Sequence, residues 1–320
     1  MRQTPAAQAG VCRLTWAPCC TAREQAMTLR VGFAGIGLMG LPLCQRLLAA
    51  GVPLTVFNRT PSKCEPLRQA GARHAQSLAE LAEHSDVLML CLADTHAVRE
   101  LMFAEHGLAQ HLRAGQRLVD FSSLEPTATC EMAARLWAER GVPWIDAPVS
   151  GGVQGAAAGS LVVMAGGAAA DIDALRPLLA HLSQRVTRMG EVGAGQVTKV
   201  CNQMLVACNA LVIAEVVALA ERCGVDAAQL APALAGGFAD SKPLQILAPQ
   251  MAAREFEPIK WHVRTLRKDL DTAVKLSLEQ GSSAPMADTA ATLMRRHSDN
   301  GYAEQDPATL LYLHRSPEHD

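Results

Sequence analysis

Short apolar segments alternate with helical segments through the first half of the chain, and this alternation constrains the fold more than any other feature. Residues 87–92 form a continuous apolar run, which is the pattern of a strand covered on both faces. Similar runs predict strands at Leu29–Ala34, Leu54–Phe57, Asp86–Leu92, Leu118–Phe121, Trp144–Ala147, Leu161–Ala165 and Arg185–Thr187. Strands that alternate with helices in this way predict an α/β fold built on a doubly wound parallel sheet.

The pattern changes after Gly195. From there to Leu313 the apolar residues recur with helical spacing, interrupted only by glycines and prolines. This predicts an all-helical C-terminal domain that begins with a long interdomain helix over Gln196–Cys223. Its apolar stretch Met204–Ala220 contains Asn209 and Glu215, so we expect it to be too short and too polar to span a membrane.

We therefore divide the 320 residues into an extension at 1–27, an α/β domain at 28–192 and a helical domain at 193–320. Because Met27 stands just before the first strand, we expect residues 1–27 to be a disordered tail or an over-extended start. The arginines of this segment also suit a targeting peptide, which is the alternative.

Charge and cysteine content narrow the possible partners. The chain has 29 Lys and Arg against 31 Asp and Glu, a net charge of −2, and no block of like charge. We therefore expect neither a nucleic-acid partner nor a membrane surface. The ten cysteines include no Cys-x-x-Cys pair, so we predict no metal site and interpret the cysteines as small buried side chains in a reducing cytoplasm.

A glycine-rich turn follows the first predicted strand and opens the first helix. Its residues are Gly35, Ile36, Gly37, Leu38, Met39 and Gly40. Glycines at these positions let the backbone approach a pyrophosphate, and the helix N-terminus supplies free amides. The bare pattern is weak, but between a strand and a helix it predicts a Rossmann-type site for a dinucleotide.

The second strand ends at Phe57 and is followed by Asn58, Arg59 and Thr60. A site that prefers NAD normally has an acidic residue here to accept hydrogen bonds from the ribose 2′-hydroxyl. Asn58 carries no charge, whereas Arg59 and Thr60 can bind a 2′-phosphate. The sequence therefore favours NADP as the cofactor, with NAD possible if Arg59 is only a solvated turn residue.

Four further residues or groups are candidates for chemistry. Ser122 follows a strand and either faces the cofactor or caps the next helix. Ser150, Gly151 and Gly152 form either a carboxylate-binding nest or a plain turn. Lys199 is one of six lysines and lies one helical turn before Asn202, so it is either a tuned proton donor or a lysine whose stem packs while its amine stays in water. Lys268 lies in a charged cluster that spacing alone would leave as a solvated face.

Together these segments resemble the β-hydroxyacid dehydrogenases. The family includes 3-hydroxyisobutyrate dehydrogenases, tartronate semialdehyde (2-hydroxy-3-oxopropionate) reductases and glyoxylate/succinic semialdehyde reductases. The resemblance covers about residues 29–315 and depends on five ordered motifs at residues 35–42, 120–126, 146–152, 193–203 and 268–270. It implies an NAD(P)-dependent oxidoreductase that interconverts a short hydroxyacid and its semialdehyde.

The resemblance also implies residue roles. Lys199 is the implied catalytic acid and base, and Ser150, Gly151, Gly152 and Asn202 are implied to contact the substrate. Ser122, Lys268, Leu92 and Ala93 are implied to line the cofactor site. The segment after Phe57 looks like the NADPH-dependent branch.

The sequence also departs from the family pattern. Ala93 stands where the family often has proline, and residues 238–242 and 258–267, which help shape the substrate pocket, do not assign the chain to a sub-branch. Imine reductases share the architecture but replace the lysine, and a cofactor-binding protein without turnover is a further alternative.

The long apolar helix over Gln196–Cys223 suggests buried surface beyond one subunit, and so a homodimer or homotetramer.

Overall fold

One sheet organises the first part of the chain. The structure is a computed structural model, and it describes residues 29–314. Within that range the strands are β1 (Val31–Ala34), β2 (Leu54–Phe57), β3 (Arg73–His74), β4 (Val87–Leu90), β5 (Arg117–Asp120), β6 (Trp144–Asp146), β7 (Val149–Ser150), β8 (Leu161–Gly166) and β9 (Ser183–Gly190). Their order is β3-β2-β1-β4-β5-β6-β8-β7, and β9 also pairs with β8.

The strand directions differ between the two ends of the sheet. Strands β1 to β6 are parallel. Strand β8 runs antiparallel to both β6 and β7, and parallel to β9. The predicted α/β fold class with a doubly wound, mostly parallel sheet is confirmed, and β8 adds an antiparallel pairing with β6 at one end.

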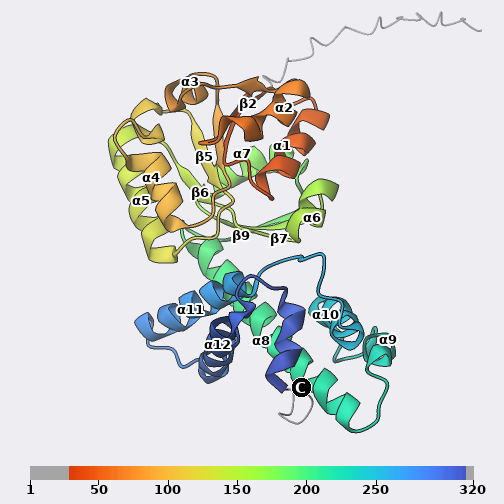
Figure 1. Ribbon diagram of the computed structural model, residues 1–320. Coiled ribbons are helices and arrows are strands. Elements are labelled where there is room, and N and C mark those ends of the chain that lie inside the picture. Colours follow the sequence, from red (N-terminus) through yellow and green to blue (C-terminus); the bar gives the residue numbers. More distant parts are fainter. Residues whose placement is uncertain (1–28, 315–320) are drawn as a thin grey trace, which may run out of the picture.

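Helices α1 to α7 belong to this α/β part (Figure 1). They are α1 (Gly40–Ala49), α2 (Glu65–Gln69), α3 (Leu78–Glu83), α4 (Thr95–Phe103), α5 (Pro126–Arg140), α6 (Gly152–Ala158) and α7 (Ala169–Leu179). Local side chains fix several helix ends. Ser77 accepts a hydrogen bond from the amide of Glu80 at the start of α3, and Asp94 accepts one from Ala97 at the start of α4.

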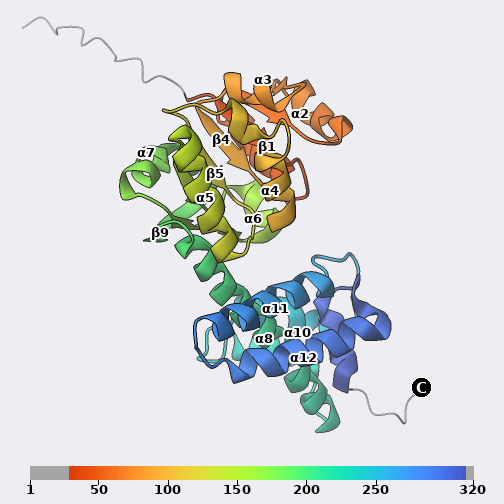
Figure 2. The ribbon, with the colours of Figure 1, turned by 90° about the vertical axis from the view of Figure 1, so that its left-hand side faces the viewer.

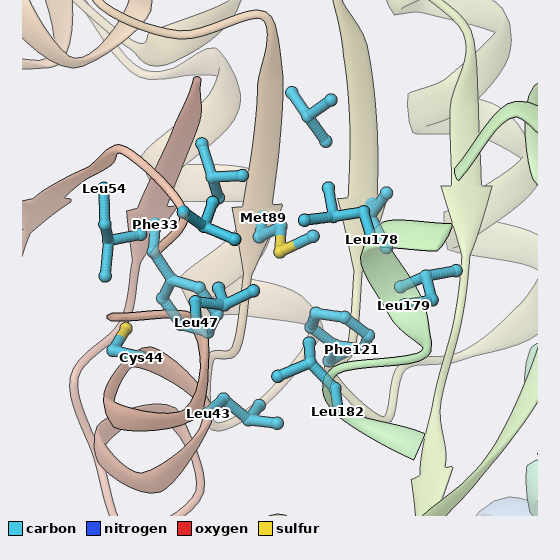
Figure 3. Close-up of a cluster of buried hydrophobic side chains, with 14 of the residues drawn as sticks. Phe33, Leu43, Cys44, Leu47, Leu54, Met89, Phe121, Leu178, Leu179 and Leu182 are labelled. Carbon is cyan, nitrogen blue, oxygen red and sulfur yellow. The ribbon is translucent and has the colours of Figure 1, made fainter. Parts of the chain in front are cut away.

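Two apolar cores cover the two faces of the sheet. In β4, Val87 and Met89 belong to the core beneath α1 and α7, whereas Leu88 and Leu90 belong to the core beneath α3, α4 and α5. Figure 3 shows Met89 among Leu47, Leu178 and other side chains of the first core. The alternation arises because successive strand residues point to opposite faces. It confirms the predicted strand with two covered faces.

The second part of the described chain is helical. Its helices are α8 (Ala194–Arg222), α9 (Leu230–Leu234), α10 (Lys242–Ala253), α11 (Val263–Glu279) and α12 (Pro285–His297), followed by a 3₁₀ segment at Pro307–His314. Helix α8 leaves the sheet and runs through the middle of this part, beside α10, α11 and α12 (Figure 2). Ala210, Ala214 and Val217 of α8 lie in the helical core.

Helix α8 is longer than the apolar stretch considered from the sequence. By length and composition alone it could cross a membrane, whereas the sequence prediction for Met204–Ala220 excluded a membrane span. A core helix of a soluble protein passes the same test, and α8 packs against three helices of its own chain. This feature is therefore weak evidence for a membrane span.

Residues 1–27 lie outside the described range, so the disordered tail or over-extended start expected there stays a prediction.

The cysteines are not uniformly buried: Cys44 and Cys64 are, but Cys130, Cys201 and Cys223 are exposed. The prediction of small buried side chains is wrong for these three: Cys201 lies on an uncovered face of α8, Cys130 lies on the exposed side of α5, and Cys223 follows the last residue of α8.

Candidate active site

A cavity of about 290 Å³ lies where the α/β part meets the helical part. The loops after β4 and β5 line it from the sheet side, and α8 and α11 line it from the helical side. Among the lining residues are Asp94, Thr95, Ser123, Leu124, Lys199, Gln203, Lys268 and Asp269. The cavity therefore lies at the carboxyl ends of parallel strands, where ligands bind in open α/β sheets.

The glycine turn between β1 and α1 is shaped by close backbone contacts. A Cβ atom on Gly35 would lie 2.3 Å from the Cys91 carbonyl oxygen, and one on Gly40 would lie 2.0 Å from the Gly35 carbonyl oxygen. Gly37 is exposed, and a Cβ there meets no atom within 4 Å. The turn therefore leaves open space at the N-terminus of α1, where backbone amides and the helix dipole favour a phosphate.

Asn58 ties this turn to the end of β2. Its side-chain oxygen accepts a hydrogen bond from the Ile36 amide (2.9 Å), and its side-chain nitrogen donates to the Thr60 carbonyl oxygen. Arg59 is different, because its side chain is 92% exposed and lies 4.0 Å from Glu100. The Arg59 guanidinium is thus accessible beside the end of β2.

Buried polar groups anchor the start of α8 to the sheet. Asp146, at the end of β6, accepts hydrogen bonds from the amides of Gly193 and Gln196, both at 2.8 Å. The Gln196 side chain accepts from the Leu124 amide and donates to the Ser122 carbonyl oxygen. These contacts fix the first turn of α8, which is the turn before Lys199.

Ser122 is buried in the same region. Its hydroxyl accepts a hydrogen bond from the Leu92 amide at 2.9 Å, which joins the ends of β5 and β4. The next residue, Ser123, lines the cavity instead. Ala93 follows Leu92 and is exposed.

Lys199 presents its amine to the cavity. The Nζ atom donates hydrogen bonds to the Val149 carbonyl oxygen (2.9 Å) and to Oε1 of Gln203 (3.0 Å). Burial lowers the pKa of Lys199 to about 8, the Asp269 carboxylate opposes that shift, and Lys268 adds to it. The amine is therefore held in place and titrates closer to neutral pH than an ordinary lysine.

Gln203 and Asp269 complete the surroundings of the amine. The side-chain nitrogen of Gln203 donates to Oδ2 of Asp269, which lies on α11. Asn202 donates to Oε1 of Gln203 at 2.9 Å. Lys268 lies beside Asp269, with its Nζ 3.5 Å from Oδ1.

The Ser150–Gly152 segment directly follows Val149, whose carbonyl oxygen accepts a hydrogen bond from Lys199. Val149 and Ser150 form β7, so the carbonyl group that accepts from Lys199 lies one residue before Ser150. Gly151 and Gly152 have φ angles of 133° and 62°, which favour glycine. Ser150 is partly buried, and both glycines are exposed.

The structure brings several of the predicted residues to one region. Lys199 and Lys268 line the cavity, Ser150 lies beside the Lys199 contact, and Asn202 reaches Lys199 only through Gln203. Sequence reasoning missed Gln203, Asp269 and Gln196. The i, i+4 spacing from Lys199 was an available signal for Gln203, whereas nothing local connects it with Asp269.

Comparisons with known proteins cover both parts of the described chain. Residues 30–190 match the family model described as the NAD binding domain of 6-phosphogluconate dehydrogenase. Residues 193–313 match the model described as NAD-binding of NADP-dependent 3-hydroxyisobutyrate dehydrogenase.

Three relatives illustrate the similarity. The 2-hydroxy-3-oxopropionate reductase of Escherichia coli (strain K12) is 33% identical over 283 residues, which covers 88% of this chain and 96% of that protein. The NAD-dependent L-serine dehydrogenase of Pseudomonas aeruginosa is 34% identical over 292 residues, covering 89% and 97%. The structure of Mycobacterium tuberculosis 3-hydroxyisobutyrate dehydrogenase with L-serine superposes with a TM-score of 0.82 at 28% identity, covering 91% and 100%.

The fold and the site define a nicotinamide-dependent oxidoreductase of the Rossmann type. The chain belongs to the β-hydroxyacid dehydrogenase family, and it is an NAD(P)-dependent hydroxyacid dehydrogenase. The family predicted from the sequence is confirmed.

Proposed function

We propose that this enzyme interconverts a short-chain hydroxyacid and its semialdehyde, with Lys199 as the residue that donates and accepts the proton. The proposed substrates are of the 3-hydroxyisobutyrate or 2-hydroxy-3-oxopropionate type. The observation that carries the proposal is the amine of Lys199, which is held by two acceptors at the wall of the cavity.

The proton chemistry follows from the state of this amine. In the reducing direction the ammonium form donates a proton to the oxygen of the developing alkoxide. In the oxidising direction the neutral amine accepts that proton from the hydroxyl group. A pKa of about 8 keeps both forms of Lys199 accessible near neutral pH.

The residues present fit a nicotinamide dinucleotide. The open space at Gly37 and the start of α1 suits its pyrophosphate. When bound, the nicotinamide donates or accepts the hydride. We assign the lining of the cofactor site to Leu92, Ala93 and Lys268, and the buried Ser122 supports this site by accepting the hydrogen bond of the Leu92 amide. The exposed guanidinium of Arg59 supports a preference for NADP over NAD.

Ser150, Gly151 and Gly152 are the proposed site for the substrate carboxylate. A hydroxyl group and two glycine amides can hold an anion, and this segment adjoins the carbonyl group that binds Lys199. Asn202 orients the lysine from one helical turn away through its contact with Gln203.

We also propose that residues 28–192 form the cofactor domain and that residues 193–320 form the substrate and dimerisation domain.

Helix α8 exposes Leu205 (67%) and Leu219 (63%) together with Val212 and Val216, at spacings that place them on one face. This face supports a homodimer or homotetramer, and a cytoplasmic location is part of the same proposal. A monomer in sedimentation velocity would contradict it.

A substrate panel tests the activity. Tartronate semialdehyde, methylmalonate semialdehyde, succinic semialdehyde and glyoxylate are each assayed with NADPH and with NADH. We expect the highest kcat/KM for one of the first two substrates with NADPH. Preference for glyoxylate or succinic semialdehyde supports the alternative reductase function, and no turnover with any substrate contradicts the proposal.

Two variants test the role of Lys199. Lys199→Ala removes the amine, and Lys199→Arg keeps a cation that does not deprotonate in the working range. Both should lower kcat by about 10²- to 10⁴-fold while NADPH binding, measured by fluorescence titration, is retained. Near-normal turnover in Lys199→Ala would show that another group transfers the proton.

A further inference from the structure

The amine of Lys199 has a defined number of hydrogen bonds to give. A lysine ammonium has three N–H donors, and two of these contact Val149 and Gln203. One donor is left for an oxygen in the cavity. The direction of that donor depends on whether both protein acceptors stay in place, so the acceptor on Gln203 determines where Lys199 can deliver a proton.

The amide of Gln203 has two ends, and only one of them can accept from an ammonium group. Its oxygen faces Lys199 and Asn202, and its nitrogen faces Oδ2 of Asp269. A carboxylate has only acceptor atoms, so it binds the nitrogen end and excludes the oxygen end. Asp269 therefore selects the orientation in which the Gln203 oxygen points to Lys199.

Asp269 is placed to do this from a separate element. It lies on α11, 66 residues from Gln203, and is only 8% exposed. Its other oxygen, Oδ1, lies 3.5 Å from the ammonium of Lys268. The two oxygens thus face different partners, and the one toward Gln203 connects α11 to the amine on α8.

We propose, on the basis of the function proposed above, that Asp269 is a positioning residue for proton transfer, which acts through Gln203 to hold the amine of Lys199 and stabilise its ammonium form. The competing interpretation is purely structural, in which Asp269 only joins α11 to α8. The two differ in how Asp269→Asn acts on catalysis, because a purely structural tie would change kcat independently of the Gln203 side chain.

The charges around Lys199 set the direction of the expected change. Asp269 favours the ammonium form and raises its pKa, whereas burial and Lys268 lower it. The other charged or titratable groups on the cavity wall come from the loops after β4 and β5. They are Asp94, His96 and Glu125. Removing only the Asp269 charge should therefore move the titration of Lys199 to lower pH.

The first test does not depend on turnover. The full-length protein is labelled with ¹³C at the lysine Cε atoms, and the signal of Lys199, one of six lysines, is assigned with Lys199→Arg. In Asp269→Asn we expect its titration midpoint to fall by about one pH unit. Asp271→Asn is the matched control, because it removes the same charge from α11 but its carboxylate contacts Arg295 and Arg267.

The second test measures coupling between Asp269 and Gln203. Rates are taken on the acidic plateau, where Lys199 is charged in every variant, with substrate KM and thermal unfolding recorded alongside. We expect Asp269→Asn to lower kcat by about tenfold in the native background, with KM changed less than about threefold. In the Gln203→Leu background the same substitution should have little further effect.

The outcomes separate this proposal from the proposed function. An unchanged Lys199 midpoint in Asp269→Asn, or losses of kcat from Asp269→Asn and Gln203→Leu that multiply independently, would overturn the positioning role even if the enzyme is active. If the substrate panel shows no turnover, the NMR titration still decides whether Asp269 holds the amine charged. A midpoint that falls in Asp269→Asn and not in Asp271→Asn supports the proposal.

Discussion

The glycine turn after β1 and the polar anchor at the start of α8 hold two sides of the candidate active site in different ways. In the turn, Gly35 and Gly40 permit backbone contacts that any side chain would block. At the anchor, Asp146 and Gln196 make hydrogen bonds inside a region closed to water. The turn depends on shape, whereas the anchor depends on paired polar atoms and on charge.

This difference has consequences for both stability and pH response. The turn contains no titratable group and uses residues within six positions of each other. The anchor joins residues 47 to 74 positions apart and includes a buried carboxylate, Asp146, whose pKa burial raises to about 6. Changes at the anchor should therefore affect folding and α8 together, and some of these effects should vary with pH.

The largest effect is expected from Gln196→Leu. The substitution leaves the Leu124 amide and the Ser122 carbonyl oxygen buried without their partner. Each unpaired group costs about 1–3 kcal/mol, so we expect the free energy of unfolding to fall by about 4 kcal/mol. Urea unfolding measures it. Gln245→Leu is the matched control on α10, because that side chain is exposed, and there we expect a loss below about 1 kcal/mol. Equal losses of unfolding free energy in the two variants would show that the Gln196 hydrogen bonds stabilise the fold no more than exposed ones do.

A smaller effect on stability separates two glycines of the turn. A methyl group on Gly40 would overlap the Gly35 carbonyl oxygen, so Gly40→Ala should lower the free energy of unfolding by about 2 kcal/mol. Gly37→Ala meets no protein atom, so stability should change by less than about 0.5 kcal/mol. It should nevertheless weaken NADPH binding, because the methyl group fills the space proposed for the pyrophosphate. Fluorescence titration and urea unfolding check both expectations, and unchanged NADPH affinity in Gly37→Ala would place the cofactor elsewhere.

The shape-dependent part of this comparison could be predicted from the sequence. The apolar run at 87–92 correctly indicated a strand covered on both faces, and the glycine spacing indicated the turn that joins β1 to α1. These signals are local, since they depend on residues close together in the chain. The antiparallel direction of β8 had no such signal, because alternation of apolar residues is the same in either direction.

The polar part could be predicted only in fragments. Lys199 stood out from its neighbours, but its partner was expected at Asn202, whereas the structure places Gln203 against the amine. Both spacings lie on one helix face, so only the rotamers of the two side chains decide between them. In the charged cluster the resemblance implies a role for Lys268, and no sequence signal singles out its neighbour Asp269. Its contact with Gln203 depends on the packing of α11 against α8, which no sequence motif contains.

The last expected effect is a difference in pH dependence, caused by Asp120. This carboxylate is fully buried beside Asp146, and burial raises its pKa to about 7. The folded state then binds a proton more tightly than the unfolded state, where the pKa is near 3.8. The contribution of Asp120 to stability is thus fully present below the unfolded pKa and is lost as the pH rises through about 7, by up to about 1.4 kcal/mol per pH unit.

Asp120→Asn removes this titration and keeps an oxygen that can accept from the Ser122 amide. Urea unfolding of both proteins at pH 5, 6, 7 and 8 should therefore give curves that diverge, with the native protein losing stability relative to the variant as the pH rises. His297, whose pKa burial lowers to about 4, contributes the opposite slope below pH 6.5, but it is present in both proteins and cancels in the difference. Parallel curves would mean that Asp120 keeps an ordinary proton affinity in the fold, and the charge dependence of this region would then have to come from Asp146.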